Sequence, residues 1–202
     1  MSVDGGYFDA MYSGSADPWG FATRWYERRK RALTLASLPR ERYGRVFEPG
    51  CSIGALTQGL AARCDALLAW ERVAVAAERA ERALAEEAHV RVRRGSVPWE
   101  WPEASFDLVV LSELLYYFSD DDLRHLLERA TGSLLPGGDL VAVHWRHPAP
   151  DHARSGDDAH RALAAHGGLA PVASHVEADF LMDVYTAGPG DAPSPAQREG
   201  LA

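Results

Sequence analysis

The chain has 202 residues, which is enough for one globular domain of ordinary size and too few for a second. Apolar residues make up 47% and charged residues 25% of the sequence, a composition typical of a globular protein with a hydrophobic core. The formal charge of −8, from 21 basic and 29 acidic side chains, disfavours sequence-independent nucleic-acid binding, because an acidic surface repels phosphate groups.

Helices and strands alternate through the first half of the sequence. Short apolar runs that end at a glycine or an acid indicate strands, and apolar residues at helical spacing indicate amphipathic helices. A Pro-Gly pair stops the first of these strands abruptly. We expect helices over Phe21–Ser37, Ala55–Cys64 and Val73–Leu84, and strands over Arg45–Gly50, Ala66–Glu71 and His89–Arg94.

The second half continues this alternation. Four consecutive apolar residues in Phe106–Glu113 predict a strand that is buried on both faces. Ser119 can cap a helix that runs to Leu135, with Leu134 on its core face, before Pro136-Gly137-Gly138 ends it. The remaining expected elements are a strand over Asp139–Trp145, a helix near Asp157–His166, and strands over Val172–Ala178 and Phe180–Ala187.

The last two apolar runs are separated almost only by Asp179, and so short a connection permits only an antiparallel hairpin. Five strands that alternate with helices predict an α/β fold with a Rossmann-like, doubly wound parallel sheet and helices on both faces. The tail from Gly188 has no apolar period and is expected to be disordered.

The cysteines and the N-terminal residues indicate in which cellular compartment the protein is expected. Cys51 and Cys64 are the only cysteines, which excludes a disulfide scaffold and a zinc module and fits a reducing environment. The N-terminus has acids and glycines where a signal peptide needs basic and then apolar residues. The most apolar stretch, Phe106–Phe118, is too short to cross a bilayer. We expect a soluble, cytoplasmic monomer or homodimer without a membrane partner.

The first candidate ligand site is the loop E-P-G-C-S-I-G, Glu48–Gly54, between the first predicted strand of the sheet and the next helix. Ligands of open α/β sheets bind beyond the carboxyl ends of the strands, where glycine lets the backbone approach them. The G-x-x-x-G spacing matches neither the dinucleotide fingerprint nor a phosphate-binding loop. Glu48 would repel a pyrophosphate and suit an ammonium or a sulfonium. The alternative is a simple strand-to-helix turn.

The second candidate is Glu71, which ends the next strand 21 residues after Gly50. An acid at this place can accept hydrogen bonds from both hydroxyls of a ribose. The alternative is a surface glutamate that begins a helix, where the helix dipole favours acids. Together, the loop and Glu71 indicate an adenosine-containing ligand without phosphate, which points to S-adenosylmethionine (SAM).

These motifs resemble the class I SAM-dependent methyltransferases, and among them the nodulation protein S (NodS) group of N-methyltransferases, which act on chitooligosaccharide amines. The resemblance implies a seven-stranded sheet, mostly parallel with the last strand antiparallel. It rests on D-P-W (Asp17–Trp19), Y-E-x-x-K (Tyr26–Lys30), E-P-G-C-S-I-G, L-S-E-L-L-Y-Y-F (Leu111–Phe118), H-W-R (His144–Arg146), G-D-x-x-H (Gly156–His160) and D-F-L-M-D-V (Asp179–Val184).

The resemblance also implies roles for the cofactor side. The methionine part of SAM would lie against the loop that contains Glu48, Gly50 and Gly54, and Glu71 would hold the ribose. Ser52 replaces the middle glycine of the family loop, and Ser96 stands where the family has an aspartate that contacts the adenine amine. The other expected cofactor contacts are Cys51, Val97, Ser112 and Trp19.

The methyl acceptor is expected beyond the fourth and fifth strands, which should be neighbours. An amine must lose a proton before it attacks the methyl group, and a histidine is a natural base. We therefore expect His144 as the base and Glu113 as the carboxylate that orients the ammonium, although the two could exchange roles. The alternative for His144 is a structural hydrogen bond to a neighbouring loop. The expected substrate-binding residues are Tyr116, Tyr117, Trp145 and Arg146.

The N-terminal segment carries many aromatic residues without an evident role in the sheet. It can form a lid that closes over bound cofactor, or a helix packed on the sheet edge. The run Arg28–Arg31 is expected to be a solvated helix face. His152, His160 and His166 lack the spacing of known ligand sets, and methyl transfer from a sulfonium needs no metal, so no metal is assigned.

The sequence thus predicts a SAM-dependent methyltransferase that N-methylates a small polar or sugar amine by direct SN2 transfer. The alternatives are O-methylation of a small molecule and a non-catalytic SAM-binding protein, whereas the loop spacing disfavours an NAD-dependent oxidoreductase. The expected divisions are a helical cap or lid over 1–43, the SAM-binding methyltransferase domain over 44–187, and a disordered tail over 188–202.

Overall fold

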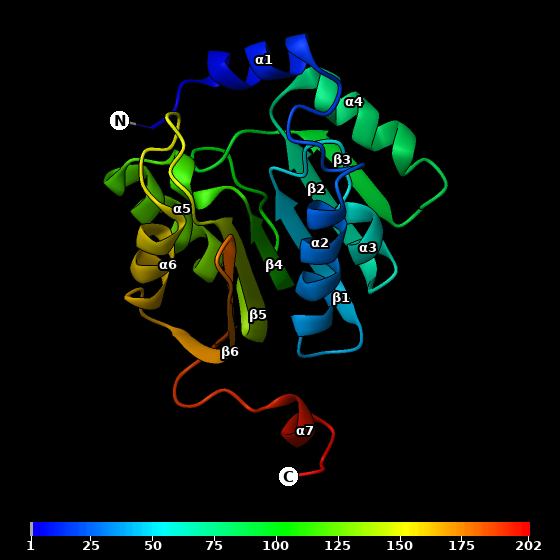
Figure 1. Cartoon of the computed structure of the whole chain (residues 1–202). Coiled ribbons are helices and arrows are strands. Elements are labelled where there is room, and N and C mark those ends of the chain that lie inside the picture. The colour runs from blue at the N-terminus through cyan, green and yellow to red at the C-terminus, as the bar shows by residue number, and fades with distance from the viewer. Residues whose placement is uncertain (1) are drawn as a thin grey trace.

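A single seven-stranded sheet organises the chain, whose computed structural model describes residues 2–202 (Figure 1). The strand order is β3-β2-β1-β4-β5-β7-β6, and only β7 runs antiparallel to its neighbours. This confirms the expected doubly wound α/β fold with an appended hairpin. The strands are β1 (Tyr43–Pro49), β2 (Cys64–Glu71), β3 (Val90–Arg94), β4 (Phe106–Ser112), β5 (Leu134–Trp145), β6 (Leu169–Val176) and β7 (Phe180–Ala187).

Helices cover both faces of this sheet (Figure 1). Those before β4 are α1 (Gly5–Gly14), α2 (Trp25–Ser37), α3 (Thr57–Ala61) and α4 (Ala74–Ala83). Those after β4 are the 3₁₀ helix η1 (Leu115–Tyr117), α5 (Asp120–Gly132), α6 (Gly156–Ala164) and α7 (Pro195–Arg198). No helix within residues 2–202 combines the length and the apolar character that crossing a membrane would require.

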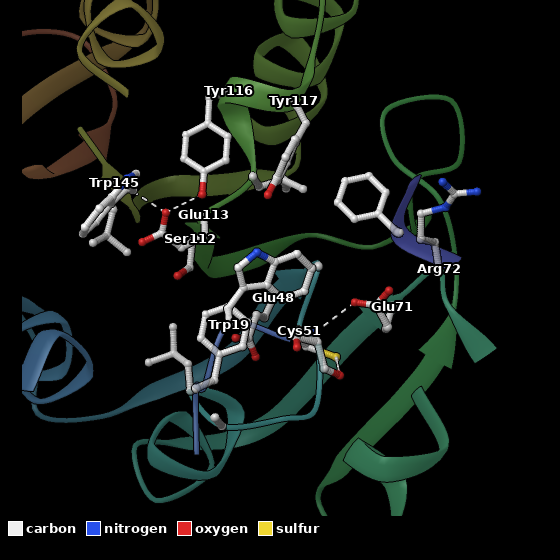
Figure 2. A pocket seen from close by; sticks show the side chains of 18 of the residues that line it. Trp19, Glu48, Cys51, Glu71, Arg72, Ser112, Glu113, Tyr116, Tyr117 and Trp145 are labelled. Carbon is white, nitrogen blue, oxygen red and sulfur yellow. Dashed lines mark hydrogen bonds between the residues drawn. The ribbon is translucent and has the colours of Figure 1, made fainter. Parts of the chain in front are cut away.

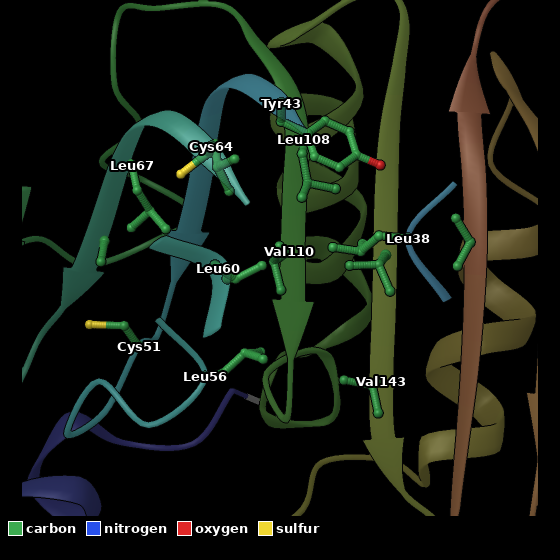
Figure 3. Packing of buried hydrophobic residues seen from close by; sticks show 14 of the residues in the cluster. Leu38, Tyr43, Cys51, Leu56, Leu60, Cys64, Leu67, Leu108, Val110 and Val143 are labelled. Carbon is green, nitrogen blue, oxygen red and sulfur yellow. The ribbon is translucent and has the colours of Figure 1, made fainter. Parts of the chain in front are cut away.

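The two hydrophobic cores follow from the alternation of side chains along a strand. In β4, Leu108 and Val110 pack into the cluster that includes Leu60 of α3 (Figure 3). Val109 and Leu111 point to the other face, where they pack with the leucines of α5 and α6. These four side chains are fully buried, because β4 is a central strand with helices on both faces of the sheet.

The boundary between α5 and β5 differs from the prediction. The helix begins at the Ser119 cap as expected, but it ends at Gly132 instead of Leu135. Leu134 pairs with Phe106 of β4 and so already belongs to β5. A Cβ on Gly138 would lie 2.9 Å from the carbonyl oxygen of Leu135, so the glycine permits this close backbone approach. The pairing of the strands overrides the helical spacing of the leucines.

Both ends of the chain contain helices that apolar periodicity does not predict. Asp4 caps α1 by accepting a hydrogen bond from the N–H of Gly6 at 2.6 Å. The tail, expected to be disordered, contains α7, which Ser194 caps and whose Arg198 donates to the fully buried Asp139 at 2.9 Å. Capping and a buried ion pair hold these segments, and neither leaves an apolar repeat in the sequence.

Candidate functional site

The carboxyl ends of β1, β2 and β4 open into a cavity of about 500 Å³. Glu48, Glu71 and Ser112 line it from these three strands, and Tyr12 of α1 and Glu27 of α2 line it from the helices. The cavity has the position that the fold predicts for a ligand site. Figure 2 shows that Glu71 and Arg72 lie at one end, Glu113 and Trp145 at the other, with Trp19 between them.

The glycine loop brings the backbone and one buried carboxylate to the cavity. Glu48 is 2% exposed and accepts a hydrogen bond from Thr57 Oγ1 at 2.7 Å. Burial raises the pKa of Glu48 to about 7, against the lowering effect of that hydrogen bond. Gly50 has φ of 76°, and a Cβ there would lie 3.2 Å from Leu114 Cδ1, so this position favours glycine.

Two other loop positions differ in their roles. Ser52 adopts φ of 54°, a left-handed conformation uncommon for serine, and its Oγ forms a hydrogen bond with the hydroxyl of Tyr12. Gly54, expected to contact the cofactor, does not line the cavity. A Cβ on Gly54 would lie 3.2 Å from Ala80 Cβ, so this glycine allows α4 to pack against the loop. Gly54 is therefore a packing position, which corrects the prediction.

Backbone N–H groups fix Glu71 at one end of the cavity. Oε2 accepts from the N–H of Ser52 at 3.0 Å and Oε1 from the N–H of Val73 at 2.8 Å. Each oxygen keeps a lone pair for a further donor, such as a ribose hydroxyl. Burial raises the pKa of Glu71, and these N–H groups oppose the shift. Three more expected cofactor contacts, Cys51, Ser96 and Val97, also line the cavity.

Glu113 organises the opposite end. It has φ of 51° directly after β4, and its Oε2 accepts from the hydroxyl of Tyr116 at 2.6 Å and from the N–H of Trp145 at 2.9 Å (Figure 2). Tyr117 lines the same end, and the ring of His152 stacks on Tyr116 with 3.8 Å between centroids. Glu113, both tyrosines and Trp145 thus lie together as expected, whereas His152 was not expected here.

Lys30 corrects the prediction of a solvated helix face for Arg28–Arg31. Lys30 is 4% exposed, and its Nζ donates to Glu27 Oε1 at 3.1 Å and to Glu113 Oε1. The same Nζ lies 4.9 Å from the ring centroid of Tyr26. Glu27, Lys30 and Thr34, at helical spacing, form the face of α2 toward the cavity. That spacing was the signal in the sequence, and it was obscured by the neighbouring arginines.

His144 does not reach the cavity, which corrects its assignment as the base. Its side chain is fully buried, and its Nε2 accepts from the backbone N–H of Leu115 at 3.0 Å. Its Nδ1 lies 2.9 Å from His160 Nε2, and His160 Nδ1 lies 2.6 Å from Asp183 Oδ2. Burial and then the nearby His160 lower the pKa of His144 well below its usual value. The structure therefore favours the structural alternative.

Arg146, expected to bind substrate, also points elsewhere. Its guanidinium forms a two-point pair with Asp157, at 3.0 and 2.8 Å, and donates to the carbonyl of Glu177 at 2.6 Å. Arg146 does not line the cavity and instead ties β5 to α6 and to the β6–β7 turn. Within residues 2–202, no three His, Cys, Asp or Glu side chains are grouped as metal ligands.

Comparison with known families decides the relationship. The family model described as nodulation protein S (NodS) matches residues 13–147. The chain belongs to the NodS family. The matched region contains all four glutamates that line the cavity, Glu27, Glu48, Glu71 and Glu113, and it ends before α6 and the closing hairpin.

Individual NodS relatives agree with this assignment. A nodulation protein S of Rhizobium tropici is 34% identical over 127 residues, which are 62% of this chain and 53% of the relative. One of Sinorhizobium fredii is 29% identical over 127 residues, 62% of this chain and 59% of the relative. The chain thus spans between half and three fifths of the length of these NodS proteins.

Solved structures show the same fold. The N-methyltransferase NodS of Bradyrhizobium japonicum WM9, solved with S-adenosyl-l-homocysteine (SAH), aligns with a TM-score of 0.80 and 24% identity over 91% of this chain and 98% of that one. A Pseudomonas syringae protein for which a methyltransferase function has been suggested is 45% identical, with a TM-score of 0.72 over 81% of this chain and 99% of that one. The fold is that of the class I SAM-dependent methyltransferases.

Proposed function

We propose that this chain transfers the methyl group of SAM to the amine of a small polar or sugar molecule. The observation that carries the proposal is a pair of buried carboxylates, Glu48 and Glu71, at the ends of adjacent strands in one cavity. The loop between them, Glu48–Gly54, has no basic side chain that would neutralise a phosphate. A cationic, phosphate-free nucleoside fits this charge pattern.

The cavity suggests how SAM would be oriented. Glu71 would accept hydrogen bonds from the ribose hydroxyls, and Ser96 and Val97 would lie against the adenine. Glu48 and the backbone around Gly50 would hold the methionine part, with Cys51, Ser112 and Trp19 as further contacts. When bound, SAM supplies a methyl group on a sulfonium that is already a good leaving group.

The residues of the chain would then position the acceptor and exclude water. Tyr116, Tyr117 and Trp145 form aromatic walls around the carboxylate of Glu113, which would orient the acceptor amine. Most of the acceleration would come from holding the methyl carbon and the acceptor nitrogen in line. An anionic acceptor end attracts an ammonium but gives no advantage to a neutral hydroxyl, so N-methylation is favoured over O-methylation. The NodS protein of Bradyrhizobium japonicum is described as an N-methyltransferase.

The first test concerns the ribose contact. We expect Glu71→Ala to weaken SAM binding by roughly tenfold or more, because hydrogen bonds to a charged group contribute about 1.5–3 kcal/mol. Glu71→Gln, which keeps one acceptor oxygen for the loop, should lose part of this affinity. Calorimetry with SAM measures both, and Glu81→Gln, at an exposed position of α4, is the control. Unchanged affinity in Glu71→Ala would remove the ribose assignment.

The second test concerns the reaction. Wild-type protein with SAM should release SAH in the presence of small polar amines, glucosamine among them. Release with hydroxyl compounds that lack an amine would instead assign an O-methyltransferase. Binding of SAM without SAH release from any acceptor would favour a non-catalytic SAM-binding protein.

A further inference from the structure

Three charged side chains from two distant parts of the chain meet at the acceptor end of the cavity. Lys30 lies between Glu27, one helical turn earlier on α2, and Glu113 after β4. All three line the cavity, and the side chains of Lys30 and Glu27 are 5% and 10% exposed. Two carboxylates thus share one ammonium in this group, and Arg31 of α2, which also lines the cavity, is a second cation near Glu27.

An ordinary ion pair on a helix surface does not explain this arrangement. Ion pairs at i,i+3 are normally exposed and contribute little to stability. Burying charged groups removes water from them at a cost in stability for each ion, and a second carboxylate increases this cost. Two buried carboxylates that share one ammonium and face a cavity are therefore expected to bind a further cation there.

The two carboxylates differ in the hydrogen bonds that they accept. Glu113 receives three donors, from Lys30, from the hydroxyl of Tyr116 and from the N–H of Trp145. Among the side-chain hydrogen bonds of residues 2–202, the carboxylate of Glu27 takes part only in the one from Lys30 to Oε1. Burial raises the pKa of Glu27, Lys30 opposes this shift, and Glu113 adds to it. Glu27 thus accepts fewer hydrogen bonds than Glu113, and its carboxylate is more basic than that of an ordinary glutamate.

We propose that Glu27 and Glu113, bridged by Lys30, form a binding site for the ammonium of the methyl acceptor, in which Glu27 takes the ammonium proton. The proposal rests on the proposed function and names the acceptor class of that site as a primary or secondary amine. Lys30 is a positioning residue, because it holds the two carboxylates at a fixed separation.

The site is close to the place where the methyl group is expected. Glu113 is followed by Leu114, whose Cδ1 would lie 3.2 Å from a Cβ added at Gly50. The residue after Glu113 is therefore packed close to the glycine loop. In the proposed step, the ammonium proton passes to a carboxylate oxygen of Glu27, and the nitrogen lone pair forms the new N–CH₃ bond. The electron pair of the breaking S–CH₃ bond remains on sulfur, which leaves in the neutral thioether SAH.

Sinefungin tests this site without knowledge of the natural acceptor. It is an analogue of SAM in which a carbon that bears an amino group replaces the methylsulfonium, so its ammonium occupies the methyl position. SAH has the same nucleoside and amino acid but no cation there. The ratio of their affinities therefore reports the acceptor end alone, because contacts to Glu48 and Glu71 cancel.

We expect wild-type protein to bind sinefungin at least about tenfold more tightly than SAH, as measured by calorimetry. Glu27→Gln keeps the size of the side chain but should lose most of this preference, while its affinity for SAH stays unchanged. Glu27→Asp, which restores the charge on a shorter side chain, should recover part of the preference. Glu81→Gln on α4 is the matched control and should behave like the wild type.

The pH dependence distinguishes Glu27 from its surroundings. The charged groups that face Glu27 are Lys30 and Arg31 from α2 and Glu113 from the segment after β4. The cavity also contains Arg24, Tyr116, Asp151 and His152. In the wild type and in His152→Gln, the preference for sinefungin should fall as the pH is lowered through the raised pKa of Glu27. In Glu27→Gln it should not change with pH.

The outcomes separate the two proposals. Equal affinities for sinefungin and SAH in the wild type, or an undiminished preference in Glu27→Gln, would overturn the ammonium site and leave the cofactor assignment intact. A pH dependence that His152→Gln abolishes would overturn the role of Glu27 as proton acceptor. Failure of both ligands to bind the wild type would overturn the proposed function itself.

Discussion

Glu48 illustrates how burial changes the chemistry of one residue. Its carboxyl group is enclosed by the glycine loop and accepts a hydrogen bond from Thr57, which is its one polar contact among the side chains of residues 2–202. Because desolvation penalises the anion, the pKa rises to about 7, so half of the molecules carry a neutral Glu48 at that pH. A bound cation would restore the charge.

We therefore expect the affinity for SAM to fall as the pH drops below about 7, because neutral Glu48 no longer attracts the methionine ammonium. If binding requires the anion, affinity at pH 6 should be roughly tenfold below that at high pH. Calorimetry at pH 6.0 and 7.5 measures this effect, and Glu48→Gln should bind weakly at both. An equal loss of affinity in Glu48→Gln between the two pH values would show that another group titrates.

His144 shows how a polar residue can serve an element instead of a ligand. Because the N–H of Leu115 donates to its Nε2, the proton of neutral His144 must lie on Nδ1, where it is donated to His160. His160 then carries its own proton on Nδ1 and donates it to Asp183. This chain of hydrogen bonds ties β5, α6 and β7 to η1, the element that carries Tyr116 and Tyr117.

The lowered pKa of His144 has a consequence for stability. The pKa of His144 is lowered in the folded state, whereas in the unfolded chain it is about 6.5. Below that pH the unfolded state binds a proton that the folded state does not, so stability is full above about pH 6.5 and falls below it. The slope reaches about 1.4 kcal/mol per pH unit for one proton.

We expect His144→Gln to lose this part of the pH dependence, since glutamine can accept from Leu115 and donate to His160 without titrating. The free energy of unfolding at pH 7.5 and 5.5, from denaturant titrations of both proteins, gives the two slopes. The raised pKa of Glu48 changes the stability with pH in the opposite direction. This contribution is the same in the wild type and in His144→Gln, so it cancels when the two slopes are subtracted. Parallel curves for the two proteins would contradict this account of His144.

At the scale of the molecule, the two ends of the chain lie beyond opposite ends of the strands of the sheet (Figure 1). Beyond the carboxyl ends of β1 and β4, the N–H of Val3 donates to the carbonyl of Tyr117, and Tyr12 forms a hydrogen bond with Ser52 of the glycine loop. The segment before β1 thus contacts both ends of the cavity, and a lid role for residues 1–43 stays a prediction. At the opposite ends of the strands, Asp139 of β5 accepts hydrogen bonds from Arg40, Tyr43, Thr186 and Arg198.

Arg198→Ala tests whether the tail belongs to the folded unit. The substitution removes a hydrogen-bond donor to the fully buried carboxylate of Asp139. The free energy of unfolding should decrease by about 1–3 kcal/mol, and the melting temperature should fall by about 2–4 °C per kcal/mol. Glu199→Ala, at an exposed neighbouring position, is the control. Equal melting temperatures for Arg198→Ala and the wild type would favour the disordered tail predicted from the sequence.

The sequence by itself determined the order along the chain of the seven strands and of the α-helices from α2 to α6, the closing hairpin, and the positions of Glu48, Glu71 and Glu113 at the ends of strands. Apolar periodicity and glycine punctuation are local properties, so they can be read without the tertiary structure. Strand boundaries such as Leu134 were not determined, since pairing with Phe106 decides them.

Only the tertiary structure decided which polar side chains face the cavity. His144 and Lys30 exchanged their expected environments: the histidine is enclosed by η1 and α6, and the lysine of an arginine-rich helix points to two carboxylates. The physical reason is that a side chain's surroundings depend on the element packed against it, which local spacing does not specify.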